Sequence, residues 1–256
     1  MEYSYEQFKK EIYRMTDIDL DSYKEKQMKR RIDSLLSSKG MKDYYEFLRL
    51  LKNDPKVLEE FIEYITINVS EFFRNPEQWA YLEKEVLPKL CVKNDLKIWS
   101  AACSTGDEPY TVSMIMKKKY PENHFLLMAT DIDEKAISMA KAGEYSKKSI
   151  VNVPAEYKEF FTLTEQGKYA VSKDVKKTVN FRKHNLFKDV YPKNVDLLIC
   201  RNVLIYFTEE KKEEIFRKFY QSLSKGGVLF LGNTEQVIDY RLIGYERIAP
   251  FFYTKP

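Results

Sequence analysis

The first 68 residues place apolar side chains three or four positions apart, the spacing of amphipathic helices. Gly40 suits a helix C-terminus, Asp43 an N-cap and Pro55 a first helical turn. We therefore predict an all-α helical domain over residues 1–68. The apolar repeats fall in four groups, at 8–15, 28–35, 47–51 and 58–65.

A break and a new helix follow this domain. The polar stretch 68–75 interrupts the helical pattern, and Pro76 suits the start of a helix that runs to about Leu90. We treat residues 69–90 as a linker and helix that lead into a second domain over 91–256.

Strand-like and helix-like segments alternate from residue 96 onward, which predicts a doubly wound, mostly parallel sheet with helices on both faces. A helix is expected over 208–224, closed by Gly226 and Gly227. The β-rich tail 245–254 follows Gly244, so the sheet is expected to end in an antiparallel pair. The other strands are predicted at 97–102, 125–131, 178–183, 195–200 and 228–232.

One stretch does not fit the alternation. Residues 146–176 are too long for a simple crossover, and 161–172 resemble a hairpin that turns near Gly167. We predict a small antiparallel β-subdomain inserted at about 146–176.

The segment 97–110 and the acidic end of the second strand indicate a nucleotide-type cofactor. A short apolar run enters a loop centred on Gly106, Pro109 suits the first turn of a helix, and Asp131 can accept hydrogen bonds from two ribose hydroxyls. A single glycine disfavours a dinucleotide, and a phosphate-binding Gly-Lys-Ser/Thr loop is absent. Asp107 and Glu108 would repel a pyrophosphate but suit a cation, which favours S-adenosylmethionine.

Composition narrows the classes of protein to which this chain can belong. Hydrophobic residues make up 44% of the chain and charged residues 32%, without an apolar run long enough for a membrane span or an N-terminal signal, so we expect a cytosolic protein without membrane insertion. Three scattered cysteines and two histidines predict no metal site. Cys103 and Cys200 are interpreted as small buried residues, and His184 as a surface or strand-edge residue. A net charge of +4 is too mild to indicate nucleic acid.

Four ordered motifs resemble the bacterial chemotaxis receptor methyltransferases, and the resemblance covers nearly the whole chain. It implies a class I S-adenosylmethionine-dependent methyltransferase with a Rossmann-like fold. It also implies methyl transfer to glutamate side chains of chemoreceptors in sensory adaptation, with glutamyl methyl esters and S-adenosylhomocysteine as products. The motifs are Asn-Val-Ser-Glu-Phe-Phe-Arg (68–74), Ser-Ala-Ala-Cys-Ser-Thr-Gly-Asp-Glu-Pro-Tyr (100–110), Ala-Thr-Asp-Ile-Asp (129–133) and Cys-Arg-Asn-Val-Leu-Ile-Tyr-Phe (200–207).

The resemblance also assigns residues. Arg74 and Tyr206 fall on positions at the reacting centre. A glutamate acceptor with a pKa of ~4.3 is already ionised at neutral pH, so the reaction needs orientation rather than a general base. We favour a role for Arg74 chiefly on the cofactor's own carboxylate, because a tight grip on the nucleophile would slow the step. The cofactor-binding positions are Asn68, Ser70, Arg74, Glu108, Asp131, Asn185, Leu186, Arg201 and Asn202.

The charge pattern and the resemblance together indicate which partners the protein binds. The run 24–31 carries five positive charges and one negative, and it is either a solvated helix face or a docking surface for the receptor's cytoplasmic methylation helices. Some relatives bind a receptor tail peptide through the β-subdomain, but only Gly167 lies in this hairpin, so we expect weak or absent tethering. We expect a cytoplasmic monomer that associates with membrane receptor clusters and does not bind nucleic acid. The cations are Lys24, Lys26, Lys29, Arg30 and Arg31.

Two other functions stay open from the residues alone. One is nucleic-acid methylation, although the chain lacks an Asn/Asp-Pro-Pro-Tyr motif and a Pro-Cys nucleophile. The other is a catalytically idle module that senses the cofactor or scaffolds receptors. The presence of both Arg74 and Tyr206 weighs against idleness.

Overall fold

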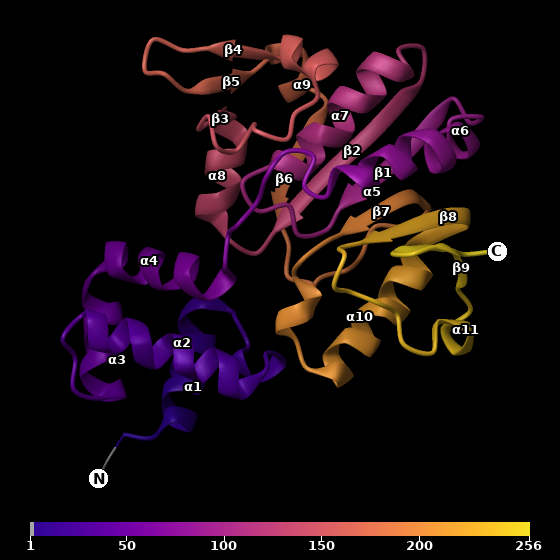
Figure 1. Cartoon of the computed structure of the whole chain (residues 1–256). Helices are drawn as coiled ribbons and strands as arrows, with labels where there is room; N and C mark the ends of the chain where they lie inside the picture. Colours follow the sequence, from indigo (N-terminus) through magenta and orange to yellow (C-terminus); the bar gives the residue numbers. More distant parts are fainter. Residues whose placement is uncertain (1–2) are drawn as a thin grey trace. The chain divides into compact units, whose positions relative to one another are not determined.

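The computed structural model describes residues 3–256, which divide into two compact units. The first unit combines the chain up to Asn68 with Tyr206–Lys212, and the second combines Val69–Ile205 with Glu213–Pro256. Figure 1 shows that the first is helical and that the second is built on a central sheet. Among the described residues, no helix is long and apolar enough to cross a bilayer.

The helical unit contains the predicted helices with the predicted ends. Gly40 follows α2 with a φ of 71°, Asp43 caps α3 by accepting from the amide of Glu46, and Pro55 begins α4. Phe8, Phe47 and Phe61 pack together in the interior, with ring centroids 5.8 to 6.1 Å apart. The elements are α1 (Tyr5–Thr16), η1 (Leu20–Ser22), α2 (Glu25–Ser38), α3 (Tyr44–Asn53) and α4 (Pro55–Thr66).

The second unit contains a seven-stranded sheet in the order β6-β2-β1-β7-β8-β10-β9. All neighbouring pairs from β6 to β8 are parallel, and β10 pairs antiparallel with both β8 and β9. The expected fold class, with its terminal antiparallel pair, is confirmed. The strands are β1 (Asp95–Ser100), β2 (His124–Asp131), β6 (Val179–Lys183), β7 (Val195–Cys200), β8 (Leu223–Leu231), β9 (Glu246–Ala249) and β10 (Phe252–Thr254).

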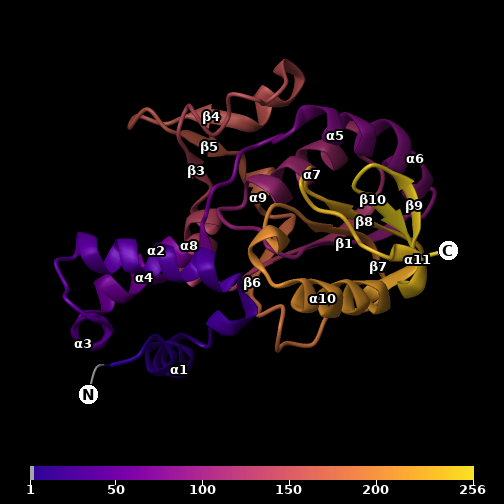
Figure 2. The same cartoon turned by 60° about the horizontal axis from the view of Figure 1, so that its bottom comes forward.

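Helices cover both faces of this sheet. In Figure 2, α7 (Asp107–Lys119) lies with α5 (Pro76–Tyr81) and α6 (Leu87–Leu90) on one face, and α10 (Glu209–Ser222) lies on the other. A π-helical turn, Leu82–Val86, joins α5 to α6, and Pro88, the second residue of α6, has no amide to donate to this turn. The predicted helix over 76–90 is therefore present with one widened turn.

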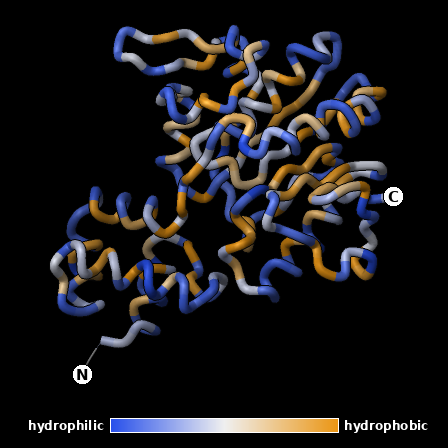
Figure 3. Tube along the Cα trace, viewed as in Figure 1, coloured by the Kyte–Doolittle hydropathy of each residue, from blue (hydrophilic) through white to orange (hydrophobic). Residues whose placement is uncertain are grey.

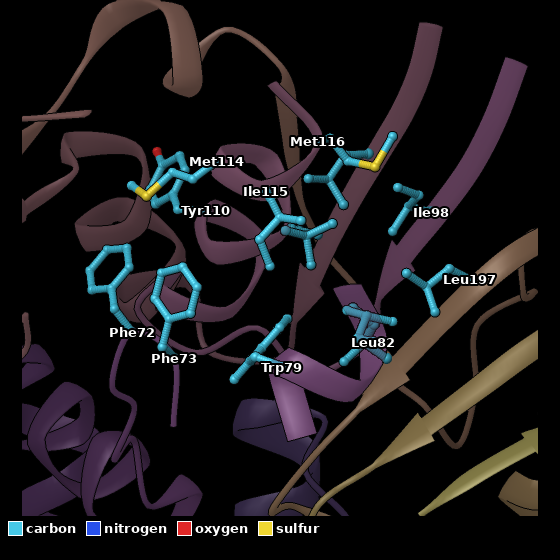
Figure 4. Packing of buried hydrophobic residues seen from close by; sticks show 14 of the residues in the cluster. Phe72, Phe73, Trp79, Leu82, Ile98, Tyr110, Met114, Ile115, Met116 and Leu197 are labelled. Atoms are coloured by element: carbon cyan, nitrogen blue, oxygen red, sulfur yellow. The ribbon is translucent and has the colours of Figure 1, made fainter. Parts of the chain in front are cut away.

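The core of the second unit fills both faces of the sheet, and a large cluster of it lies on the face that α7 covers. Every residue of β7 is buried, and α7 is buried from Asp107 to Met116 because other elements cover its outer side as well. Hydrophobic segments accordingly run through the central strands in Figure 3. Figure 4 shows Phe72, Phe73 and Trp79 packed near α7, so the segment before α5 is part of this core.

A separate three-stranded antiparallel sheet, in the order β3-β5-β4, is present as predicted, but its first strand, at 144–145, lies just before the predicted start at about 146. Its hairpin turns at Gly167, which has a φ of 74°, as the sequence predicted. Its elements are β3 (Glu144–Tyr145), η3 (Ala155–Phe160), β4 (Phe161–Leu163), β5 (Tyr169–Val171) and, after it, α9 (Lys173–Lys176).

One prediction about α10 is wrong. Gly226 and Gly227 do not close the helix, because α10 ends at Ser222 and β8 already begins at Leu223. The glycine pair lies against the end of the chain, where the amide of Gly226 donates to the carbonyl of Lys255. A Cβ on Gly227 would lie 2.7 Å from the carbonyl oxygen of Val195, so close strand packing explains the glycine.

Gly106 joins β1 to α7 in a tight turn. Its φ of 92° favours glycine, and a Cβ there would lie 2.8 Å from the Cβ of Ala140 in α8 (Glu134–Ala142). The loop therefore approaches α8 more closely than any side chain permits.

We predict that Gly106→Ala lowers the free energy of unfolding by about 2–5 kcal/mol, since backbone strain and overpacking add. Gly167→Ala is the matched control, because Gly167 has a similar backbone conformation but open space around it. It should cost about 1–2 kcal/mol. Urea denaturation measures both, and equal losses would contradict the role assigned to the contact with Ala140.

Candidate active site

The predicted site residues of the second unit follow the carboxyl ends of the parallel strands. The strand order reverses between β1 and β7, and ligands of doubly wound sheets bind at such a switch point. Asp131 ends β2, the loop before α7 follows β1, and Arg201 follows β7. These side chains are therefore gathered at one edge of the sheet.

Asp131 ties two loops together. One carboxylate oxygen accepts from the amide of Ser104 at 2.7 Å, and the other accepts from the amide of Asp133 at 3.0 Å. Asp133 caps α8 by accepting from the amides of Lys135 and Ala136. A carboxylate has about four acceptor positions, so Asp131 retains acceptor capacity for a pair of hydroxyls.

Glu108 is a buried carboxylate in the first turn of α7. The hydroxyl of Ser100 donates to it at 2.8 Å, and Nη1 of Arg201 lies 3.8 Å from its other oxygen. Burial raises the pKa of Glu108 to about 7, and the nearby Arg201 opposes that rise. A cationic ligand group beside Glu108 would restore the charged form.

The segment before α5 is anchored to α7 through Asp107. The hydroxyls of Thr105 and Ser70 both bond to this carboxylate, and burial raises its pKa to about 6. The amide of Phe73 also donates to the hydroxyl of Thr111 at 3.3 Å. Ser70 is therefore held next to the first residue of α7, where the loop after β1 ends.

Arg201 fixes the backbone at Arg74. Its Nη2 donates to the carbonyl of Arg74 at 2.7 Å and to the side chains of Gln78 and Asn75 at 2.8 and 3.2 Å. The indole of Trp79 donates to the same carbonyl at 3.0 Å, and the guanidinium of Arg201 lies over the Trp79 ring. The Arg74 side chain is half-buried and donates to the carbonyl of Val69.

Two buried donor groups near this cluster lack a hydrogen-bond partner, namely Nε of Arg201 and the side-chain nitrogen Nε2 of Gln78. Buried donors are rarely left unpaired, so an acceptor on a bound ligand is a natural partner for them. Together with Glu108 and Asp131, they fit a ligand that has a cationic group, a carboxylate and vicinal hydroxyls.

Asn185 and Leu186 are buried just after β6. Asn185 is held by Asp189, which accepts from its amide at 2.8 Å, while its own side chain accepts from Phe187 at 2.9 Å. The preceding amide, of His184, donates to the carbonyl of Asp131. The loop after β6 is therefore attached to the end of β2.

The prediction for His184 is wrong in placing it at the surface, although the residue does follow β6, an edge strand of the sheet. Only 9% of this residue is exposed, and its ring lies between Trp99 and Tyr191, with centroids 5.4 and 5.5 Å away. The chain after β6 folds back and places Tyr191 over it. Burial lowers the pKa of His184. Cys103 and Cys200 are buried, as expected, and burial raises their pKa values well above the ordinary range.

Glu235 is a site residue that sequence reasoning missed. Its carboxylate accepts from four backbone amides, those of Asn202, Val203, Leu204 and Gly232, at 2.8 to 3.0 Å. Asn202 has a φ of 61°, a left-handed conformation that the carboxylate stabilises. The available signal was an acidic residue shortly after a strand, which alone is too common to single out.

Asn68 and Tyr206 belong to the helical unit. The side chain of Asn68 donates to the hydroxyl of Thr66, and the carbonyl of Tyr206 accepts from the amide of Lys24. Their participation in the site stays a prediction.

Comparison with known proteins gives two family matches and several similar proteins. Residues 4–66 match the CheR methyltransferase all-alpha domain, and residues 68–243 match the CheR methyltransferase SAM binding domain. The chain is 40% identical over 257 residues to a chemotaxis protein methyltransferase of Listeria monocytogenes, covering 100% of this chain and 98% of the relative. It is 33% identical to a chemotaxis protein methyltransferase of Borreliella burgdorferi, covering 95% and 91%. The matches support S-adenosylmethionine as the cofactor.

We predict that S-adenosylmethionine binds more weakly as the pH falls from 8 to 6. Below pH 7 Glu108 is protonated in the free protein and loses its attraction for the ligand's amino group. The dissociation constant should rise up to about tenfold per pH unit below 7. Calorimetry on wild type and Glu108→Gln checks this, and the variant should bind weakly with little change between pH 6 and 7.5. A wild-type dissociation constant that stays constant over this range would contradict the role of Glu108.

We also predict that Glu235→Gln weakens cofactor binding about tenfold or more and lowers the free energy of unfolding by about 2–4 kcal/mol. The amide has one acceptor oxygen, so buried backbone donors lose their partner. Calorimetry and urea denaturation measure the two effects. Glu213→Gln is the control, because Glu213 lies on α10 with an exposed ion pair to Arg217, and it should be nearly neutral. Equal behaviour of the two variants would remove Glu235 from the site.

Proposed function

The chain belongs to the CheR methyltransferase family, and we propose that it methylates glutamate side chains on the cytoplasmic helices of chemoreceptors. Its activity as an S-adenosylmethionine-dependent methyltransferase of chemotaxis follows from that membership. The proposal adds the acceptor group, the glutamyl methyl ester as product and the receptor as substrate.

One observation supports the choice of acceptor: among the described residues at this edge of the sheet, the side chains that could act as a general base are already hydrogen-bonded or enclosed. Glu108 and Asp131 are buried and already hydrogen-bonded, and the ring of His184 is enclosed by aromatic side chains. Cys103 and Cys200 are buried thiols. A carboxylate acceptor, with an ordinary pKa of ~4.3, is already ionised at neutral pH and requires no base.

The residues present fit S-adenosylmethionine, which supplies an electrophilic methyl group when it is bound. In the proposal, Asp131 accepts from the ribose hydroxyls, Glu108 faces the amino group and Arg74 binds the carboxylate. Other contacts are assigned to Asn68, Ser70, Asn185, Leu186, Arg201 and Asn202.

Arg74 and Tyr206 have different proposed tasks. Arg74 acts chiefly on the cofactor's carboxylate, and the backbone bonds from Arg201 and Trp79 to its carbonyl support that role by fixing its main chain. Tyr206 orients the acceptor carboxylate or lines the methyl pocket. Correct alignment of an ionised acceptor can lower a barrier by roughly 7–11 kcal/mol at best, so positioning residues suffice for this chemistry.

The basic run 24–31 is the proposed receptor-docking surface. Lys24, Lys26 and Arg30 are exposed, although Lys24 has a long ion pair with Glu209 at 4.0 Å. Lys29 pairs with Asp33, and Arg31 donates to the carbonyl of Tyr64. The exposed cations are therefore the better candidates for an acidic partner. The β-subdomain has β4 at its edge, and our expectation of weak or absent tail tethering stays a prediction.

We predict that the protein transfers labelled methyl groups to receptor fragments that contain the methylation helices. Mild base should then release the label as volatile methanol, which identifies an ester. RNA and buffer incubated with the same cofactor are the controls. Label confined to RNA would refute the proposal and support nucleic-acid methylation, and no transfer to any acceptor would support an idle binding module.

The same reaction with Arg74→Ala tests the division of roles. Because Arg74 is assigned to the cofactor's carboxylate, the variant should lose cofactor affinity, measured by calorimetry, in parallel with turnover. Unchanged cofactor affinity with lost turnover would instead place Arg74 on the acceptor.

A further inference from the structure

The segment Tyr206–Lys212 leaves the second unit and belongs to the helical unit. There it lies beside Ser22–Lys24, which joins η1 to α2. The amide of Lys24 donates to the carbonyl of Tyr206 at 2.9 Å, and the amide of Thr208 donates to the carbonyl of Ser22 at 3.1 Å. Tyr23 and Phe207 thus form an antiparallel bridge outside any named strand. We call Ser22–Lys24 together with Tyr206–Thr208 the bridge.

Side chains strengthen the bridge. The rings of Tyr23 and Phe207 meet edge to face with centroids 5.0 Å apart, and both residues are buried. Ser22 is fully buried, and its hydroxyl donates to Asp19 at 2.9 Å. Backbone pairing and burial together define the main-chain position of Phe207 and of the carbonyl before it.

The chain on the other side of Tyr206 is held separately. Glu235 accepts from the amides of Asn202, Val203 and Leu204 in the second unit. Only Ile205 lies between Leu204 and Tyr206. Along the chain, the backbone is therefore hydrogen-bonded at Leu204 by Glu235 and at Tyr206 by Lys24.

We propose that Ser22–Lys24 is a positioning element for Tyr206, so that the helical unit contributes to turnover through this tyrosine. The inference rests on the proposed function, which assigns Tyr206 to the reacting centre. Alignment of reacting groups is sensitive to displacements of about 1 Å, so release of the Tyr206 carbonyl should reduce turnover without reducing cofactor affinity. Tyr23 supplies the side-chain part of this element and the amide of Lys24 the backbone part.

The backbone and charge of Lys24 can be separated by substitution. Its φ of −60° suits proline, and the extended conformation of Tyr23, with φ −102° and ψ 158°, suits a residue before proline. Lys24→Pro removes the amide that bonds to Tyr206, whereas Lys24→Ala keeps that amide. Both variants lose the same charge, so any effect of charge on the receptor KM is common to them.

The experiment compares kcat and KM for methyl transfer to receptor fragments, cofactor affinity by calorimetry, and hydrogen exchange of peptides covering 203–212. We expect Lys24→Pro to lower kcat at least tenfold, to speed exchange and to keep the cofactor dissociation constant within twofold of wild type. Lys24→Ala, which loses the same charge but keeps the amide, should keep a kcat at least fivefold above that of Lys24→Pro. Tyr23→Ala should resemble Lys24→Pro, and Tyr23→Phe should recover most of the kcat.

Equal kcat values for Lys24→Pro and Lys24→Ala, or faster exchange with an unchanged kcat, would overturn the positioning role. The role would also be overturned if Lys24→Pro lost cofactor affinity together with kcat. The substitution would then disturb the cofactor site and not only Tyr206. A wild-type enzyme that transfers no methyl to receptors refutes the proposed function instead. In that case hydrogen exchange still tests whether the bridge holds this segment. Equal exchange rates of peptides 203–212 in all variants would show that it does not.

Discussion

The guanidinium of Arg201 holds together the parts of the site that are distant in sequence. Only 3% of its side chain is exposed, yet it follows β7 directly and donates to Arg74, Asn75 and Gln78, more than 120 residues earlier. A buried cation is tolerated only when acceptors and a counter-charge surround it, and here the carbonyl, two side-chain oxygens and Glu108 provide them. The segment before α5 therefore has its place because the end of β7 requires acceptors there. The buried charge of Arg201 therefore determines both where the segment before α5 lies and which charges surround Glu108.

The acidic residues around that charge form a binding environment suited to a cation. Burial raises the pKa values of Glu108 and Asp107, to about 7 and about 6. A positive ligand group bound beside these carboxyl groups would favour their ionised form. Burial also raises the pKa of Asp131, and two backbone amides hold its carboxylate in one orientation. Pre-orientation of this kind reduces the entropy lost on binding, and it explains how a site with so few titratable bases can serve a transfer reaction.

Much of this arrangement could be predicted from the sequence, because its signals are local. Helical spacing, Gly106 between a strand and a helix, and Asp131 at a strand end each follow from periodicity or from the carboxyl-edge rule. The failures involve contacts made across the fold. Glu235 bonds to backbone amides more than 30 residues earlier, and amides have no sequence signature. His184 is buried because Tyr191 folds over it, and Gly227 is glycine because Val195 approaches it.

The course of the chain has a consequence for how this protein is divided. The helical unit is discontinuous, since Tyr206–Lys212 rejoins it long after Asn68, and α10 starts with these residues and ends in the other unit. Phe207, only 3% exposed, uses Tyr23 as its cover. A fragment that begins at Val69 would lack Tyr23 and would therefore expose Phe207. A boundary drawn between the two family matches therefore assigns Phe207 to one fragment and the ring that covers it to the other.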